Sequence, residues 1–254
     1  MITAITRKIS PSINKCELTH LERQPIDYQI ATNQHEKYEK VLRSLGIKVI
    51  SLPAEGNLPD SVFVEDTAIV LDEIAIITNP GAVSRKPEIF AIANALSTFR
   101  KLDYIMAPAS LDGGDVLVIG KNIYIGFSSR SNHLALMQMQ SILSPYGYTI
   151  QGVEINDCLH LKSAVTRVAE KTLLINPDWI DKKLFPGMGF IEIDGSEPFS
   201  ANALLVEQSI IFPVAFPKTR GRLKVAGRAV IPVDMSELEK AEGGVTCCSL
   251  IFRS

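Results

Sequence analysis

The stretch Asp66-Thr-Ala-Ile-Val-Leu71, followed by Asp72-Glu73 and Ile74-Ala-Ile-Ile-Thr78, decides the fold. Two short aliphatic runs on either side of a polar pair predict a strand, a tight turn and a second strand. The same plan recurs along the chain. Further hairpins are predicted in 115–126, 163–176 and 203–212, and an incomplete one begins at Cys247 and runs to the C-terminus.

Each copy opens on a polar residue, at positions 66, 115, 160, 202 and 247, so the copies start 49, 45, 42 and 45 residues apart. A period of about 45 residues with one hairpin in each unit is typical of a closed or stacked repeat architecture. Between the hairpins, apolar residues at helical spacing predict helices. The predicted helices cover 28–45, 86–100, 131–143 and 220–226.

The N-terminal segment is predicted to supply the strand that the incomplete last hairpin lacks. Residues 1–9 are typical of a strand, which would complete the unit begun at Cys247 and close a ring of five. Such closure leaves no exposed sheet edge. Hairpins joined by helices could also form an open α/β sheet. No Gly/Ser-rich linker or charge run divides the chain, which predicts a single domain over 1–254.

Composition narrows the class of protein. The 254 residues carry a net charge of −2 with no long run of either sign, which argues against nucleic acid as the main partner. The N-terminus lacks the apolar region of a secretory signal, and the longest apolar run, 210–217, is too short to cross a membrane. Four cysteines, two of them adjacent, and no CxxC pair predict neither a disulfide framework nor a zinc site. We expect a cytoplasmic protein that binds no membrane.

If the five units surround one axis, the residues that open them meet at one end of it. That set combines carboxylates, an imidazole, an amide and a thiol: Glu65, Asp66, Asp112, Asp115, His160, Asn202 and Cys247. Together these groups are typical of a catalytic site. Taken singly, each has a simpler interpretation: a buried thiol, a core histidine, turn residues such as Asp60, a tight turn at Gly113-Gly114, and solvated charges at Arg85 and Arg130.

Several motifs match a known family: LPDSVFVED (58–66), LDGGDVL (111–117), LHLKS (159–163), MSELEK (235–240) and GGVTCCSL (243–250). With these motifs the sequence resembles the dimethylarginine dimethylaminohydrolases nearly end to end. That family belongs to a superfamily that modifies guanidino groups and includes arginine deiminases and amidinotransferases. The resemblance implies a five-bladed pseudosymmetric α/β propeller built of ββαβ modules.

The resemblance also implies roles for individual residues. Cys247 takes the place of the nucleophile and His160 that of the general acid and base. Asp112 takes the acidic position that orients the histidine and the guanidinium, where some bacterial members have Glu. Glu65 and Asp66 match the carboxylates that bind the substrate guanidinium. The positions that hold the amino-acid end or line the lid are matched by Leu18, Asp60, Arg85, Arg130 and the backbone at Ala241.

The adjacent thiol of Cys248 competes with Cys247 for the role of nucleophile. Neighbouring residues of a strand point to opposite faces, so only one of the two can face the site. The repeat phase and the resemblance both favour Cys247. Cys248 is therefore predicted to be structural.

The reaction implied by the resemblance suits these residue types. A guanidinium is cationic and resonance-stabilised, so carboxylates must hold its charge while a strong nucleophile, such as a thiolate, attacks its central carbon. His160 would protonate the departing amine and then take a proton from the water that displaces sulfur. We expect a methylated arginine as the small-molecule substrate, citrulline as the product, no cofactor, no metal ion, and a monomer or homodimer. The alternatives are an arginine deiminase or other guanidino hydrolase, and a non-catalytic propeller that binds a macromolecule.

Overall fold

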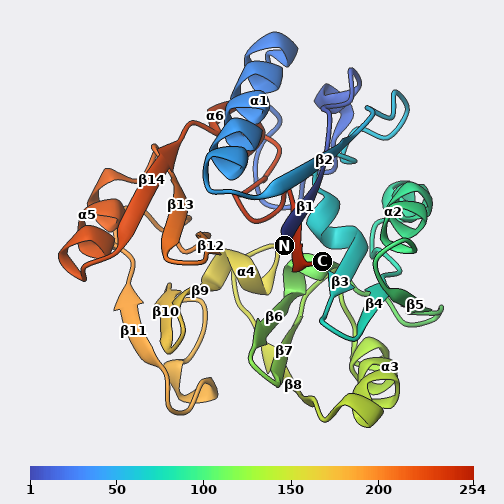
Figure 1. Cartoon of the computed structure of the whole chain (residues 1–254). Coiled ribbons are helices and arrows are strands. Elements are labelled where there is room, and N and C mark those ends of the chain that lie inside the picture. The colour runs from blue at the N-terminus through green and yellow to red at the C-terminus, as the bar shows by residue number, and fades with distance from the viewer.

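The computed structural model describes all residues from Met1 to Ser254 and arranges them as five three-stranded sheets around a central axis (Figure 1). In every sheet the middle strand is antiparallel to one neighbour and parallel to the other. The predicted five-bladed α/β propeller is confirmed, and so is the predicted repeat of hairpins.

The strands follow one another blade by blade along the chain. The blade that contains both termini has the order β15-β1-β2, and the other four are β3-β4-β5, β6-β7-β8, β9-β10-β11 and β12-β13-β14. The bounds of the strands are β1 Ile2–Arg7, β2 Lys48–Leu52, β3 Ala68–Val70, β4 Ile74–Ile77, β5 Lys101–Tyr104, β6 Val116–Ile119, β7 Asn122–Phe127, β8 Thr149–Glu154, β9 Val165–Ala169, β10 Thr172–Ile175, β11 Gly189–Glu192, β12 Leu204–Val206, β13 Ser209–Pro213, β14 Ala229–Val233 and β15 Leu250–Arg253.

The two ends of the chain close the ring. Strand β1 pairs antiparallel with β15, with Ile2 opposite Arg253 and Ile5 opposite Leu250, and both termini lie near the axis in Figure 1. The predicted closure by the N-terminal strand is therefore confirmed, and the open-sheet alternative is wrong. The strand β15 begins only at Leu250, because residues 245–248 form a turn in which Cys247 N donates to Gly244 O at 3.2 Å. The prediction of a strand starting at Cys247 is wrong in this respect.

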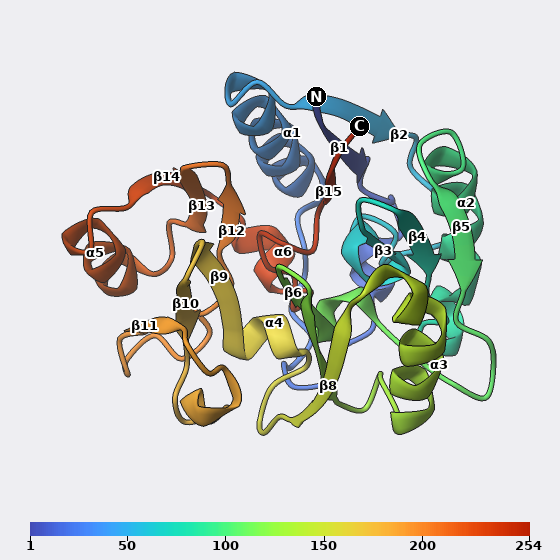
Figure 2. The same ribbon diagram turned by 60° about the horizontal axis from the view of Figure 1, so that its bottom comes forward.

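Helices connect the second and third strands of four blades and lie at the periphery (Figures 1 and 2). These are α1 Tyr28–Ser44, α2 Ile89–Leu96, α3 His133–Leu143 and α5 Pro217–Val225. The fourth blade has only a 3₁₀ turn in that place, Lys182–Leu184. Two short helices, α4 Leu161–Ala164 and α6 Ser236–Glu239, precede β9 and β15, and α4 lies near the axis in both views. Further 3₁₀ turns cover Ile13–Lys15, Val64–Thr67, Val83–Glu88, Gly113–Asp115 and Ser144–Tyr146.

The helix bounds differ from those predicted for identifiable reasons. Helix α2 is shorter at both ends than 86–100, and the 3₁₀ turn Val83–Glu88, which contains Pro87, precedes it. Helix α3 starts two residues late because the side chain of Asn132 caps it by accepting from Ala135 N. Helix α5 starts three residues early, at Pro217, a favoured first position of a helix. Helix α1 matches its prediction to within one residue, and Asp27 caps it.

The core consists of five clusters, each joining two neighbouring blades. Strand β4 shows why its sequence is apolar throughout. Ile74 and Ile76 point into the cluster shared with the next blade, whereas Ala75 and Ile77 point into the cluster shared with the previous one. Since side chains of a strand alternate between its two faces, a strand buried on both faces needs an unbroken apolar run.

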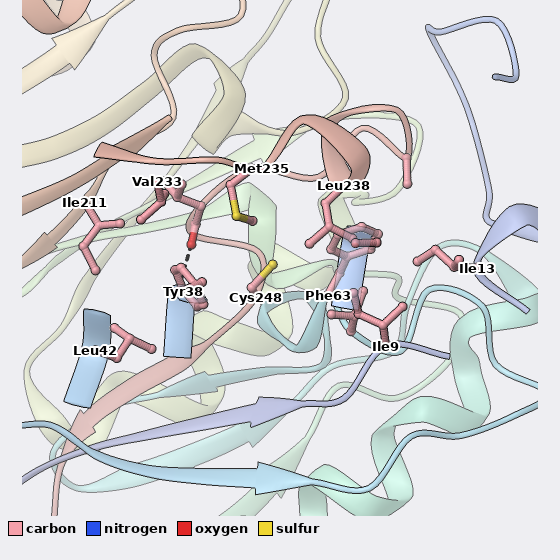
Figure 3. Packing of buried hydrophobic residues seen from close by; sticks show 14 of the residues in the cluster. Ile9, Ile13, Tyr38, Leu42, Phe63, Ile211, Val233, Met235, Leu238 and Cys248 are labelled. Atoms are coloured by element: carbon pink, nitrogen blue, oxygen red, sulfur yellow. Dashed lines mark hydrogen bonds between the residues drawn. The ribbon is translucent and has the colours of Figure 1, made fainter. Parts of the chain in front are cut away.

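The largest cluster holds the segment before β15 in place. Figure 3 shows Tyr38 and Leu42 of α1 in this cluster, together with Cys248 and the apolar side chains of Met235 and Leu238. The phenol of Tyr38 donates to Val245 O at 3.0 Å and lies 2.7 Å from Ser249 Oγ. Helix α1 thereby fixes both sides of the turn that carries Cys247.

Candidate active site

The predicted histidine lies between two buried carboxylates. His160 Nε2 is 3.1 Å from Asp112 Oδ2, and its Nδ1 is 3.9 Å from Asp66 Oδ1. Burial lowers the pKa of His160, but Asp66, Asp115 and Asp112 outweigh burial and raise that pKa to about 9. The imidazole is therefore protonated at neutral pH before a substrate binds, which suits a group that must first donate a proton.

Backbone donors hold the two carboxylates in position. Gly114 N donates to Asp66 Oδ1 at 2.9 Å, and Gly81 N donates to Asp112 Oδ1 at 2.9 Å. Burial raises the pKa of Asp66, yet His160 and Arg85 together lower it to about 2. Asp66 is thus ionised throughout the neutral range and can attract a cation.

The glycine pair of the LDGGD motif does more than form a turn. It lies in the 3₁₀ turn Gly113–Asp115, and a Cβ on Gly114 would lie 2.6 Å from His160 Nδ1 and 2.8 Å from Asp66 Oδ1. A Cβ on Gly113 would lie 2.0 Å from Glu65 O. Only glycine lets the turn approach the imidazole and both carboxylate segments this closely.

The predicted nucleophile sits on the turn before β15. Cys247 Sγ accepts a hydrogen bond from Gly244 N at 3.3 Å. Burial, helped by the carboxylates of Glu65 and Asp66, raises the pKa of Cys247, whereas the Gly244 N–H and Lys162 act against that rise. Without a bound cation the group is a thiol. Its neighbour Cys248 is fully buried in the core cluster of Figure 3, as predicted for a structural residue.

Glu65 belongs to a polar network that the sequence indicated only in part. Its Oε1 accepts from Lys162 Nζ at 2.7 Å and its Oε2 from Thr246 Oγ1 at 2.7 Å. Asn202, noted for its repeat phase, donates to Thr246 Oγ1 and accepts from Thr246 N. Sequence reasoning missed Lys162 and Thr246, although both lie inside the LHLKS and GGVTCCSL motifs that pointed to the site.

Arg85 is buried, so its interpretation as a solvated surface charge is wrong. Its Nη1 donates to Asp66 Oδ2 at 2.6 Å, and its Nε and Nη2 donate to Glu88 at distances of 2.9 to 3.2 Å. Nη2 also donates to Phe63 O at 3.0 Å. Burial lowers the pKa of Arg85, but Glu88 and Asp66 hold it well above its ordinary value. The second N–H of Nη1 is the only donor of this guanidinium without an acceptor.

Two of the residues predicted to hold the amino-acid end, Asp60 and Arg130, contact a short segment near the N-terminus. Glu17 N donates to both carboxylate oxygens of Asp60 at 3.2 Å, and Arg130 Nη2 donates to Thr19 Oγ1 at 3.1 Å. Leu18 packs against the largest core cluster. Glu242, which sequence reasoning missed, accepts from the backbone N–H groups that follow Leu18: those of Thr19, His20 and Leu21.

Two adjacent cavities meet at Cys247 and His160. The smaller, of about 30 Å³, is lined by most of the predicted site residues: Asp60, Asp66, Arg85, Asp112, Arg130, His160, Ala241 and Cys247. Of these two cavities, Glu65 lines only the larger, of about 300 Å³, which is also lined by Lys162, Asn202 and Glu242. The structure therefore brings the predicted residues together, except that Leu18 lines neither cavity.

Asp66, Asp112 and His160 could also offer one ligand atom each to a metal ion, since these atoms lie within 4.8 Å of one another. The prediction that no metal takes part stays a prediction. No helix combines the length and apolar character needed to span a bilayer.

The sequence of this chain is similar to those of known proteins. The family model described as "N,N dimethylarginine dimethylhydrolase, eukaryotic" matches residues 6–185. N(G),N(G)-dimethylarginine dimethylaminohydrolase of Pseudomonas aeruginosa is 36% identical over 228 residues, covering 89% of this chain and 90% of that protein. The enzyme of the same name from Streptomyces coelicolor is 34% identical over 253 residues, covering 98% and 96%.

Solved structures agree with these relatives. The Pseudomonas aeruginosa enzyme, as a cysteine-to-serine mutant complexed with citrulline, superposes with a TM-score of 0.94 at 34% identity and covers 98% of both chains. A histidine-to-glycine variant of a dimethylarginine dimethylaminohydrolase, as an adduct with S-methyl-L-thiocitrulline, gives a TM-score of 0.93 at the same identity, covering 98% of this chain and 99% of that chain. The N-terminal domain of the cyanobacterial arginine dihydrolase ArgZ gives 0.87 at 18% identity, covering 98% and 97%. This last likeness concerns the fold alone.

Proposed function

The chain belongs to the dimethylarginine dimethylaminohydrolase family, and from this membership and the geometry of the site we propose that it hydrolyses Nω-methylated L-arginine to L-citrulline and a methylamine. One observation carries the proposal above the others. A single small cavity brings the thiol of Cys247 together with the His160–Asp112 pair and with the carboxylate of Asp66. These are the groups that a reaction at a guanidinium carbon requires.

The cavity has opposite charges that suit the two ends of a free amino acid. Asp66 and Asp112 hold the substrate guanidinium beside His160, and Glu65 faces it from the larger cavity. Arg130 and the free N–H of Arg85 bind the carboxylate of the amino acid, since a guanidinium fork pairs well with it. Asp60 and the backbone at Ala241, which line the smaller cavity, receive the α-ammonium group.

Substrate binding activates the nucleophile. Burial and the negative charges of Glu65 and Asp66 keep Cys247 protonated in the free enzyme, and the guanidinium offsets those charges when it binds. The thiol then releases its proton to solvent, and the thiolate attacks the central carbon and forms a C–S bond. The C–N bond to the methylated nitrogen breaks as His160 gives its proton to the departing amine, which leaves a thiouronium on Cys247.

Hydrolysis of that intermediate returns the site to its starting state. His160, now neutral, takes a proton from a water molecule whose oxygen bonds to the central carbon. The C–S bond breaks, and the Cys247 thiolate takes up the proton that the hydroxyl group of the intermediate releases as the citrulline carbonyl forms, so citrulline leaves and the thiol is restored. Asp112, held by Gly81 N, keeps the imidazole oriented through both steps.

A citrulline-formation screen tests the proposed function. The purified protein is offered arginine, monomethylarginine, and asymmetric and symmetric dimethylarginine, with the Cys247→Ser variant as control. We expect citrulline from the monomethyl and asymmetric dimethyl compounds and none from the variant. Preference for unmethylated arginine would favour the arginine deiminase alternative, and no citrulline from any compound would favour the binding propeller.

We also propose that residues 1–254 form one catalytic domain. The pairing of β1 with β15 joins the two ends of the chain, and each core cluster joins neighbouring blades. A single cooperative transition, monitored by both circular dichroism and loss of activity, is the expected result. Two separate transitions would contradict it.

A further inference from the structure

Several residues that line the larger cavity have no role in the proposed reaction. This cavity shares Cys247 and His160 with the smaller cavity but is about ten times larger, about 300 Å³ against 30 Å³. Its remaining walls include the apolar side chains of Leu21, Phe199, Pro213 and Phe216, and the carboxylate of Glu239. Phe199 is half exposed, so it lies where this cavity meets solvent.

Glu239 is the unusual member of this wall. It is the last residue of α6, and its Oε1 is buried without a hydrogen-bond donor, the only carboxylate oxygen of the chain in that state. Burial, with the charge of Asp234 acting in the same direction, raises the pKa of Glu239 to about 7. No hydrogen bond reaches either oxygen of this carboxylate, and Oε2, unlike Oε1, is not fully buried, so a cationic N–H donor in the cavity would bind at Oε2 and offset the cost of burying the charge.

The other charged groups of the cavity already have partners. Lys162 pairs with Glu65 at 2.7 Å, and Glu242 accepts from three backbone N–H groups. Glu239 is therefore the group with unused capacity to bind a cation. The rings of Phe199 and Phe216 line the same cavity and add apolar surface and the π faces that attract alkylammonium ions.

We propose that this cavity receives the ω-substituent of the substrate and then holds the departing amine as a small alkylammonium ion, with Glu239 as its specificity-determining acceptor. This inference rests on the proposed function. There the amino-acid end points toward Arg130, so the ω-nitrogens point past Cys247 toward the larger cavity. After the C–N bond breaks, the amine carries the proton of His160, and it takes a second proton from water to become the ammonium ion.

Inhibition by dimethylammonium chloride tests this inference. Dimethylammonium should slow citrulline formation and should bind to the resting protein in isothermal titration calorimetry, and the second measurement does not depend on turnover. Glu239→Gln should weaken both effects about tenfold, because it removes the charge of a charged hydrogen bond. Glu170→Gln, which removes an exposed carboxylate from the turn between β9 and β10, should leave both effects unchanged.

A second variant separates the contribution of the apolar residues of the cavity from that of the carboxylate of Glu239. Phe199→Ala should weaken inhibition by dimethylammonium several-fold and leave inhibition by ammonium as it was, since ammonium has no methyl groups to contact the ring. Equal sensitivity of the wild-type and Glu239→Gln proteins would overturn the inference. If citrulline forms while dimethylammonium has no effect in either measurement, the cavity assignment fails and the proposed function stands; if no citrulline forms, the proposed function itself fails.

Discussion

Glu242 and Thr19 lie 223 residues apart in the chain, and the carboxylate of Glu242 accepts the backbone N–H of Thr19 at 3.0 and 3.1 Å. The same carboxylate accepts the next two N–H groups, of His20 at 2.5 Å and Leu21 at 2.7 Å. Because Glu242 lies five residues before Cys247, these bonds tie the segment 18–21 to the segment that carries the thiol. Both segments line the larger cavity.

Replacing Glu242 should loosen the contact between the segment 18–21 and the segment that carries Cys247. Glu242→Ala removes the acceptor of all three N–H groups, so we expect faster alkylation of Cys247 by iodoacetamide and a KM raised about tenfold, because bonds to a charged acceptor contribute about 1.5–3 kcal/mol. Glu242→Gln keeps an acceptor oxygen, so its alkylation rate and its KM should lie between those of the wild type and those of Glu242→Ala. An unchanged alkylation rate in Glu242→Ala would show that the segment stays closed without this residue.

The two arginines of the small cavity should respond differently to truncation. Arg85→Ala leaves the buried carboxylates of Asp66 and Glu88 without their cation, a change that typically costs about 3–5 kcal/mol, so the free energy of unfolding should fall markedly. Arg130→Ala removes a partly exposed side chain and should mainly raise KM. Urea unfolding of both variants measures this difference. A free energy of unfolding equal to that of the wild type in Arg85→Ala would contradict a stabilising role for Arg85.

The adjacent thiols should separate into one that reacts and one that packs. Cys247→Ser should abolish turnover, because a neutral hydroxyl is a far weaker nucleophile than a thiolate. Cys248→Ser should keep most of the activity and lose stability by about 1–3 kcal/mol, since it places a hydroxyl in an apolar cluster. Mass spectrometry of a trapped substrate adduct should find it on Cys247. An adduct on Cys248 would reverse the assignment.

His160 should control both the rate and part of the pH dependence of stability. His160→Gln should lower kcat about 10²–10⁴-fold, with a smaller loss for an S-methylthio substrate whose leaving group needs no protonation. The pKa of His160 is about 9 in the folded protein against 6.5 for the unperturbed group. Its contribution to stability is therefore complete below pH 6.5 and is lost as the pH rises through about 9. Over that range the wild type should lose more stability than His160→Gln in urea titrations.

The second glycine of the LDGGD motif should be as necessary as the charged residues. Gly114→Ala puts a Cβ within 3 Å of both His160 and Asp66, so the imidazole must move away from the carboxylates. We expect a loss of kcat of at least about 10²-fold, the size expected when general acid and base catalysis is lost. Gly221→Ala is the matched control for folding, since Gly221 lies in the peripheral helix α5 with a negative φ and nothing within 4 Å of an added Cβ. A Gly114→Ala enzyme with wild-type kcat would show that the approach can relax.

The sequence by itself determined the blades and their closure, because these depend on local patterns. The run Ile74-Ala-Ile-Ile is apolar on both faces of a strand, and four more hairpins of the same plan recur at a regular period. The third strand of each blade left a weaker signal. Strand β5, Lys101–Tyr104, has no buried residue, so burial imposes no apolar pattern on it.

The tertiary structure alone decided which side chains satisfy one another at the site. The Arg85–Asp66 pair and the bonds from Glu242 to the segment 18–21 join residues that no sequence period relates, since such contacts depend on how the blades close. Likewise, whether the carboxylate of Glu239 finds a hydrogen-bond donor depends on how α6 packs beside the larger cavity. The sequence supplied the types of chemical group and their common end of the ring. Distance, burial and the pairing of charges then determined which of them are free to act on a substrate.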